Sequence, residues 1–245
     1  MEDLQTLSNK KLYHQLTEAV ISKLVDEKFR SQLPQVYLTY IKPVEQHLHP
    51  LKLAKLATLT AQLKTVPDAL VFLNELLVKF TPTEDDYKKW TCLKIQAYIY
   101  LKLEVIHYTC VKQDYASADV LLKSVESDML KVTSLETIVN AQYYKVKSDW
   151  YQLKGEFELY YSTSFEYLKY STNTTKEELK RRGMDMSIAA LLGNIYRFGD
   201  LIQHPVFTGV DEWLHQLVVA AQQGQLTVFE QLKPQILQNV YSSLI

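Results

Sequence analysis

Apolar residues recur at intervals of three or four along nearly the whole chain, the spacing that places side chains on one face of an α-helix. Two such runs are Leu12, Leu16, Val20 and Leu24, and Leu70, Leu73, Leu77 and Phe80. No convincing run alternates with a period of two, as a half-buried β-strand would. The pattern therefore predicts an all-α protein made of many amphipathic helices.

Residues that form turns are scarce in this chain. An average sequence of 245 residues would contain roughly 17 glycines and 12 prolines, whereas this one has 6 and 7. The breaks between apolar runs coincide with these residues, as at Val66-Pro67-Asp68, Lys154-Gly155-Glu156 and Gly224-Gln225. Few turns imply long helices. The clearest predicted helix start is Thr83, followed by acidic residues that suit the positive end of a helix dipole.

Several predicted helices open in the same way, with a turn residue, then an aromatic or apolar residue, then a small one. These openings lie near Tyr13, Asp68, Tyr115 and Phe157, roughly 40 to 55 residues apart, which is close to the period of helical-pair solenoids. One helix pair cannot bury both of its faces, so neighbouring pairs stack and share a core. We therefore expect residues 1–245 to form a single domain, a right-handed superhelical stack of antiparallel helix pairs like a TPR or HEAT α-solenoid.

The charge balance and the N-terminus exclude several classes of partner. With 27 basic and 28 acidic residues, the net charge of -1 creates no overall field that would attract nucleic acid or anionic lipid. The first residues lack a signal segment, and no charge-free apolar run is long enough to span a bilayer. We expect a cytoplasmic and nuclear protein with neither nucleic acid nor membrane as partner.

The short motifs that carry catalysis or cofactor binding are missing, so we expect no enzyme activity, no small-molecule substrate, no metal and no cofactor. His47 and His49 form a His-x-His pair, but no further metal ligand is evident nearby, and a solvated loop is favoured. Cys92 and Cys110 lie about 27 Å apart if they share one helix, so they cannot bridge. Both are expected to be small buried hydrophobic residues and not nucleophiles.

Two clusters allow a binding interpretation beside a structural one. Lys176, Lys180, Arg181 and Arg182 suit a nuclear signal or a patch for an acidic partner, but Glu177 and Glu178 interleave with them, which favours the solvated face of a helix. Aromatic residues crowd the segment 143–170 and could stack on nucleic-acid bases. Because no basic stripe accompanies them, core packing is the favoured interpretation.

The most informative stretch runs from Met186 to Val206. It resembles the segment that leads into the PCI module in the family of the proteasome lid subunit called non-ATPase regulatory subunit thirteen. Within this stretch the residues that carry the resemblance are Leu191, Leu192, Gly193, Phe198, Gly199, Asp200, Leu201, His204 and Pro205. Further matches in the same order are Lys11–Leu16, Phe157–Leu168, Trp213–Leu217 and Gly224–Phe229.

The resemblance implies an organisation for the chain. Residues up to about 182 would form N-terminal helical repeats and 183–245 the helical part of a PCI module, with the winged helix absent and a monomer expected in isolation. The motif residues are expected to maintain the fold. Gly193 and Gly199 would permit close approach or a positive backbone angle, Pro205 would end a helix begun near Phe198, and His204 would be a hydrogen-bonded packing residue.

The resemblance also implies a function. It indicates a non-catalytic structural subunit of the proteasome regulatory particle lid, which supports ubiquitin-dependent protein degradation. Its partners would be other lid subunits and the ubiquitin-receptor subunit, and no partner-binding residue can be singled out. Three alternatives stay open: a scaffold of the signalosome or of a translation initiation factor, a nucleic-acid adaptor of the mRNA-export type, and an enzyme with an unrecognised site.

Overall fold

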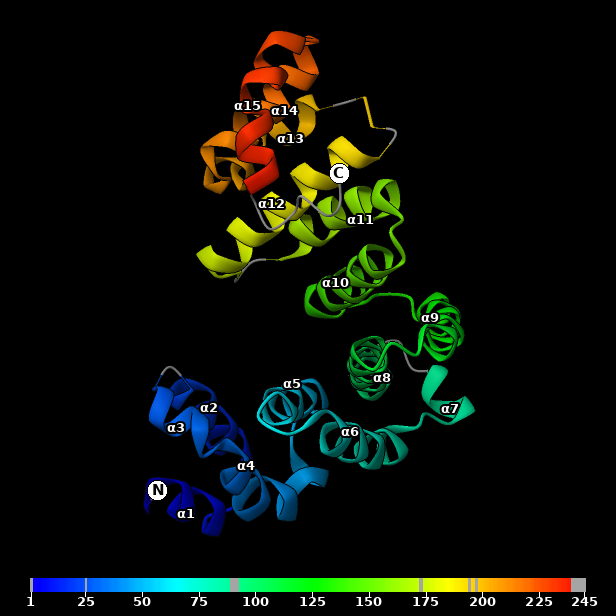
Figure 1. The fold of residues 1–245 in the computed structure, drawn as a ribbon. Helices are drawn as coiled ribbons and strands as arrows, with labels where there is room; N and C mark the ends of the chain where they lie inside the picture. The colour runs from blue at the N-terminus through cyan, green and yellow to red at the C-terminus, as the bar shows by residue number, and fades with distance from the viewer. Residues whose placement is uncertain are drawn as a thin grey trace. The chain divides into compact units, whose positions relative to one another are not determined.

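The computed structural model describes residues 2–24, 26–88, 93–171, 174–193, 195–196 and 198–238. In these residues every regular element is a helix and no strand is present. The predicted all-α stack of helices is therefore confirmed (Figure 1). The handedness of the superhelix stays a prediction. The chain divides into two compact units, Met1–Val139 and Asn140–Ile245, which are described separately below.

The first unit contains eleven elements in the described residues: α1 (Glu2–Asn9), α2 (Tyr13–Lys23), α3 (Glu27–Ser31), α4 (Leu33–Val36), the π-helix η1 (Tyr37–Ile41), the 3-10 helix η2 (Lys42–His47), α5 (Pro50–Ala61), α6 (Val66–Phe80), α7 (Glu84–Tyr87), α8 (Leu93–Val111) and α9 (Tyr115–Leu130). Helix α10 (Thr137–Lys154) begins at the boundary. The second unit continues with α11 (Phe157–Tyr170), α12 (Lys176–Leu192), α13 (Gly199–Gln203), the 3-10 helix η3 (Pro205–Gly209), α14 (Glu212–Gln223) and α15 (Leu226–Gln238).

Helix α8 is the core of the first unit. It packs against α5, α6 and α9, and every residue from Ile99 to Ile106 is buried. A mainly apolar helix that is buried on all sides is stable in water only when neighbours cover all of it. The three neighbouring helices are therefore held in place by the burial of a single central helix.

Helix α12 has the same role in the second unit. It packs against α11, η3 and α14, and all residues from Met186 to Ala190 are buried. The surrounding core includes the fully or almost fully buried side chains of Tyr160, Leu201, Phe207, Leu214 and Val218. The aromatic segment predicted to pack in a core contributes Tyr160, Tyr161 and Tyr167 to this burial.

Four helix ends share one turn geometry. Each contains a residue with a positive backbone angle φ: Lys11 (57°), Gln113 (63°), Gly155 (73°) and Gly224 (68°). At Gly155 the N–H donates to Gln152 O over 3.1 Å, and the N–H of Glu156 donates to Tyr151 O over 3.0 Å. The other three ends repeat this pair of bonds, which defines a Schellman turn.

A new helix begins two residues after each Schellman turn, at Tyr13, Tyr115, Phe157 and Leu226. Three of these positions are the openings expected from the sequence repeat. The fourth expected opening, near Asp68, lies in α6, which starts at Val66 after a cap in which the Thr65 side chain accepts from the Asp68 N–H. A recurring tight turn thus underlies most of the degenerate repeat.

The helix start expected at Thr83 is present but leads into α7, which has four residues. The Asp86 carboxylate accepts from the Thr83 N–H and from its hydroxyl, each over 3.0 Å. The backbone N–H of Thr83 and the ammonium of Lys94 hold the pKa of Asp86 well below its usual range. The strong capping residues therefore close a single turn and do not open a long helix.

Changing the left-handed turn residues should shift stability in opposite directions. Gly155→Ala should lower the free energy of unfolding by about 1 kcal/mol, because a Cβ disfavours positive φ even though it would meet nothing within 4 Å. Gln113→Gly should raise it by up to about 1 kcal/mol, because the same strain is removed. Urea unfolding followed by circular dichroism measures both. Gly199→Ala is the control, and shifts of the same sign at Gly155 and Gln113 would contradict the assignment.

Candidate functional site

The first part of the family motif ends α12 and brings it against α11. Leu191 and Leu192 are half-buried and pack on the core of the second unit. Gly193 caps the helix with φ -85, so its backbone angle is one that any residue adopts. A Cβ there would lie 2.9 Å from Ala189 O and 3.4 Å from the Glu158 N of α11. The tight contact is thus with the last turn of α12 itself, whereas the contact with α11 is of ordinary van der Waals length.

The second part of the motif forms α13. Phe198 precedes the helix and packs half-buried on the core, and Leu201 is fully buried. Asp200 is exposed. A Cβ on Gly199 would find its nearest heavy atom, Gln222 Nε2, at 4.0 Å, so neither space nor a positive φ requires glycine here. The motif thus anchors α13 through Phe198 and Leu201.

His204 and Pro205 join α13 to η3. Pro205 opens η3, and α13 ends at Gln203. The His204 Nδ1 accepts from the Val206 N–H over 3.1 Å, and its ring meets the Phe165 ring edge-on with centroids 5.6 Å apart. Burial lowers the pKa of His204 below 6.5. The imidazole is therefore placed as a neutral acceptor within the packing.

The sequence did not point to Gly183, although the backbone of η3 approaches this glycine more closely than any neighbour approaches the motif glycines. A Cβ at Gly183 would lie 2.6 Å from Val206 O and 3.0 Å from the Val210 Cγ2. The glycine thus lets η3 lie directly on α12. The available signal was an isolated glycine inside a helical pattern, which often marks a packing requirement.

Arg182 is buried between three helices, so the expectation that it lies on a solvated basic face is wrong. Its side chain is 2% exposed and donates to Ser148 Oγ over 2.8 Å and to Asp149 Oδ1 over 3.0 Å, both on α10. The guanidinium carbon also lies 4.5 Å from the Tyr167 ring of α11. Burial alone would lower the pKa of Arg182, but the charge of Asp149, together with smaller contributions from Tyr160, Tyr167 and Glu178, outweighs burial and raises the pKa.

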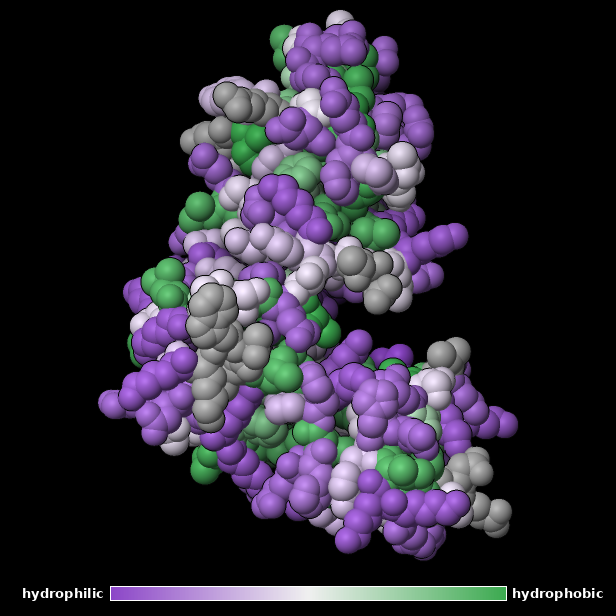
Figure 2. Space-filling view, turned by 180° about the vertical axis from the view of Figure 1, so that it is seen from behind, coloured by the Kyte–Doolittle hydropathy of each residue, from purple (hydrophilic) through white to green (hydrophobic). Residues whose placement is uncertain are grey.

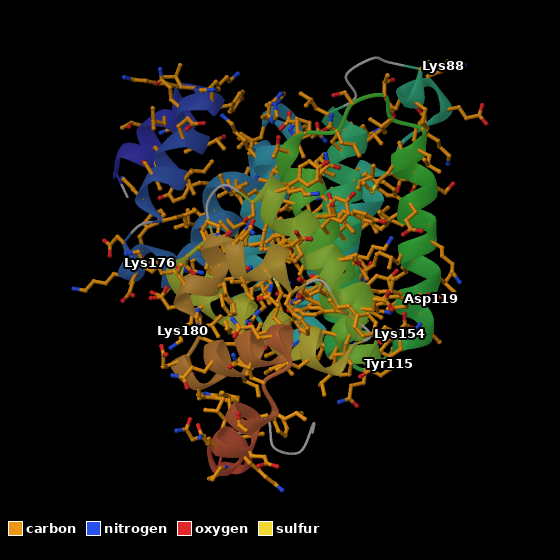
Figure 3. The ribbon with its side chains drawn as sticks, turned by 90° about the horizontal axis from the view of Figure 1, so that it is seen from above. Lys88, Tyr115, Asp119, Lys154, Lys176 and Lys180 are labelled. Carbon is orange, nitrogen blue, oxygen red and sulfur yellow. The ribbon has the colours of Figure 1, made fainter. Side chains whose placement is uncertain are left out.

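Part of the same basic cluster does reach solvent. Figure 3 shows Lys176 and Lys180 on α12 with their side chains away from the core, and both are exposed. Lys180 Nζ lies 2.8 Å from Asp211 Oδ1, in the residue that precedes α14. One of the two exposed lysines is therefore paired with an acidic group of its own unit.

A second buried charge joins α8 to α9 in the first unit. Lys102 Nζ lies 2.9 Å from Asp128 Oδ2 and 2.7 Å from Ser124 Oγ. Burial raises the pKa of Asp128, but hydrogen bonds and charges from Lys102 and Lys131 outweigh burial, so the pKa is lowered overall. A paired and hydrogen-bonded charge of this kind fixes which helix faces meet.

The residues weighed for chemistry do not converge on a reactive centre. Cys110 is buried in α8, and Cys92 lies outside the described residues. The His47 ring stacks on Tyr13 with centroids 5.0 Å apart. In the part of the chain that the structure describes, no group of three or more histidine, cysteine or acidic residues could hold a metal ion. None of its helices combines the length and apolar character needed to cross a lipid bilayer.

Apolar side chains on the surface are the remaining candidates for a functional role. Figure 2 shows one face of the chain, mostly hydrophilic, with separate hydrophobic residues among the polar ones. In the first unit Leu38, Leu63 and Val71 are exposed and line a groove of about 530 Å³ beside Phe72. Lys42, Lys64, Asp68 and Glu75 line the same groove, so its apolar surface is interrupted by charges.

These features define the class of protein: an α-helical repeat protein whose motif residues serve packing and whose surface carries some exposed apolar side chains. The family described as PSD13 N-terminal repeats matches residues 1–219. The chain belongs to this family. The resemblance inferred from the motif around Gly193 is thereby confirmed.

Several curated relatives resemble the chain along nearly its whole length. The probable 26S proteasome regulatory subunit rpn9 of Schizosaccharomyces pombe is 30% identical over 96% of this chain and 60% of its own length. The 26S proteasome non-ATPase regulatory subunit 13 homolog A of Arabidopsis thaliana is 28% identical over 94% of this chain and 60% of its own length. The 26S proteasome regulatory subunit RPN9 of Saccharomyces cerevisiae is 26% identical over 94% of this chain and 62% of its own length. The chain thus spans about three fifths of the length of these relatives.

Removing the buried guanidinium should strongly destabilise the second unit. Arg182→Ala is expected to lower the free energy of unfolding by about 3 kcal/mol, since Asp149 and Ser148 lose their buried partner. Arg181→Ala, at an exposed neighbouring position, should change it by less than about 0.5 kcal/mol. Urea unfolding of both variants measures the difference. Equal losses for the two arginines would show that the buried contacts of Arg182 do not hold the helices together.

The stability of the second unit should depend on the titration of His204. Its pKa in the folded state lies below that of the unfolded chain, so protonation favours unfolding. The stabilisation is complete above pH 6.5 and is lost as the pH falls through the depressed value. An NMR titration of the imidazole should give a pKa below 6.5, and His204→Asn should flatten the stability profile in this range. A pKa at or above the ordinary value would contradict the burial.

Proposed function

We propose that this chain is the helical-repeat part of a non-catalytic structural subunit of the proteasome regulatory particle lid. The observation that carries the proposal is the match of the family described as PSD13 N-terminal repeats to residues 1–219. The relatives are named as regulatory or non-ATPase proteasome subunits, which supports a role other than catalysis. Because the chain spans 60% of the first relative's length, the role of a whole subunit is part of the proposal.

The proposed mechanism is scaffolding. A helical stack presents long surfaces on which neighbouring subunits can dock, and a stable contact buries about 1,600 Å² in total. Exposed apolar side chains such as Val78 and Leu130, 76% and 88% exposed, supply surface that a partner can bury. We propose other lid subunits and the ubiquitin-receptor subunit as partners, and the cytoplasm and nucleus as the location.

The motif region contributes to this role by its rigidity. We propose that 183–245 form the helical part of a PCI module. The close packing of Gly183 against η3 supports a fixed geometry for the helices that would present this module. The motif residues would therefore act on assembly through the fold and not by direct contact.

Affinity purification from cells tests the proposal. A tagged full-length protein should recover proteasome regulatory subunits in amounts comparable to its own, while the tag alone recovers none. Mass spectrometry of the eluate measures both. Recovery of signalosome or translation initiation subunits without proteasome subunits would overturn the proposal. Recovery of RNA that is lost in moderate salt, with no proteasome subunits, would favour a nucleic-acid adaptor.

A further inference from the structure

A pocket in the second unit has no role in the packing described above. It has a volume of about 370 Å³ and lies where α10 ends, α11 begins and α12 passes beside them. Its lining includes Gln152, Leu153, Gly155, Phe157, Asp185 and Ile188. A single water fills roughly 30 Å³, and ligand pockets occupy roughly 300–1,000 Å³. The space therefore suits one large side chain.

The walls of this pocket are mainly apolar and reach the surface. Leu153 is 51% exposed and borders the pocket together with the half-buried Phe157. The turn at Gly155 leaves its edge open, since a Cβ there would meet no atom within 4 Å. A long side chain can enter past Leu153 without displacing the backbone.

Asp185 places an acidic group in this apolar setting. It is half-buried, and it forms no ion pair with the described residues. Three cations lie nearby. Arg182 donates to Ser148 and Asp149, and Arg181 is exposed to solvent. Lys154 also lines the pocket, and its Nζ lies 4.1 Å from the Trp150 ring centroid and 3.4 Å from Glu156 Oε1. Burial raises the pKa of Asp185, although Gln152 and two arginines offset part of this rise. The ionised carboxylate is thus incompletely compensated.

We propose that the Asp185 pocket binds an arginine side chain of a partner protein. The aliphatic stem would pack on Leu153 and Phe157, and the guanidinium would donate to the Asp185 carboxylate. Arginine suits the site because its guanidinium is weakly hydrated and matches a carboxylate, while its stem covers apolar surface. The inference rests on the proposed scaffold role for the existence of a partner, and it adds the chemistry of one contact point.

A peptide titration of the full chain tests the proposal. The probe is the peptide acetyl-Ala-Leu-Arg-Leu-Ala-amide. The matched control peptide has citrulline in place of arginine, which keeps the shape of the side chain and removes its charge. In two-dimensional NMR spectra the arginine peptide should shift the amide signals of Leu153, Gly155 and Ile188. The citrulline peptide should bind at least about tenfold more weakly, because a charge-assisted hydrogen bond is lost.

Variants assign the effect to the pocket. Asp185→Asn should weaken arginine-peptide binding by about tenfold or more while retaining the fold, since burial disfavours the charge that it removes. Leu153→Ala should also weaken binding. Glu158→Gln and Leu159→Ala, at exposed positions on α11 outside the pocket lining, should leave binding unchanged.

Two results would overturn the proposal: no shift of the pocket amides at about 10 mM peptide, or equal binding by the wild-type chain and Asp185→Asn. The titration uses the chain alone, so its failure leaves the co-purification of proteasome subunits unaffected. Failure of the co-purification would equally leave the peptide result standing.

Discussion

The structure depends on two helices that cannot be covered by a single neighbour. Every residue of α8 from Ile99 to Ile106 is buried, and so is every residue of α12 from Met186 to Ala190. Covering such a helix requires partners on several sides, and α8 has α5, α6 and α9 while α12 has α11, η3 and α14. Stacking is thus the condition under which these sequences remain folded in water, and each unit acquires an extended outer surface as a consequence.

Buried charges add specificity to this apolar packing. Lys102 pairs with Asp128 across α8 and α9, and Arg182 joins α12 to Ser148 and Asp149 of α10. Such pairs contribute little net stability compared with apolar residues of the same volume, but a mismatched neighbour would leave a charge buried without a partner. They therefore select one register between adjacent helices, which a scaffold needs if its surfaces are to stay in fixed positions.

The helical class and most helix starts could be predicted because they depend on local spacing and on residues such as Gly155 and Gly224. The helix opening near Tyr115 was predicted as well, but the left-handed angle at Gln113 before it could not be, since such an angle at a non-glycine residue is rare and depends on the surrounding hairpin. Arg182 resembles its exposed neighbour Arg181 in sequence, and only the tertiary position of α10 distinguishes them. The Asp185 pocket joins the end of α10 to the middle of α12, so no short motif could have indicated it.

In each unit the central helix holds the surrounding helices in place. Hydrogen–deuterium exchange of the intact chain, followed by mass spectrometry of its peptides, tests this claim most directly. Amides of α8 and of the second half of α12 should exchange slowest, at least about tenfold more slowly than those of α1, α7 and α13, because they open only when their whole unit unfolds. Exchange in α8 as fast as in α1 would show that the central helices do not hold the stack together.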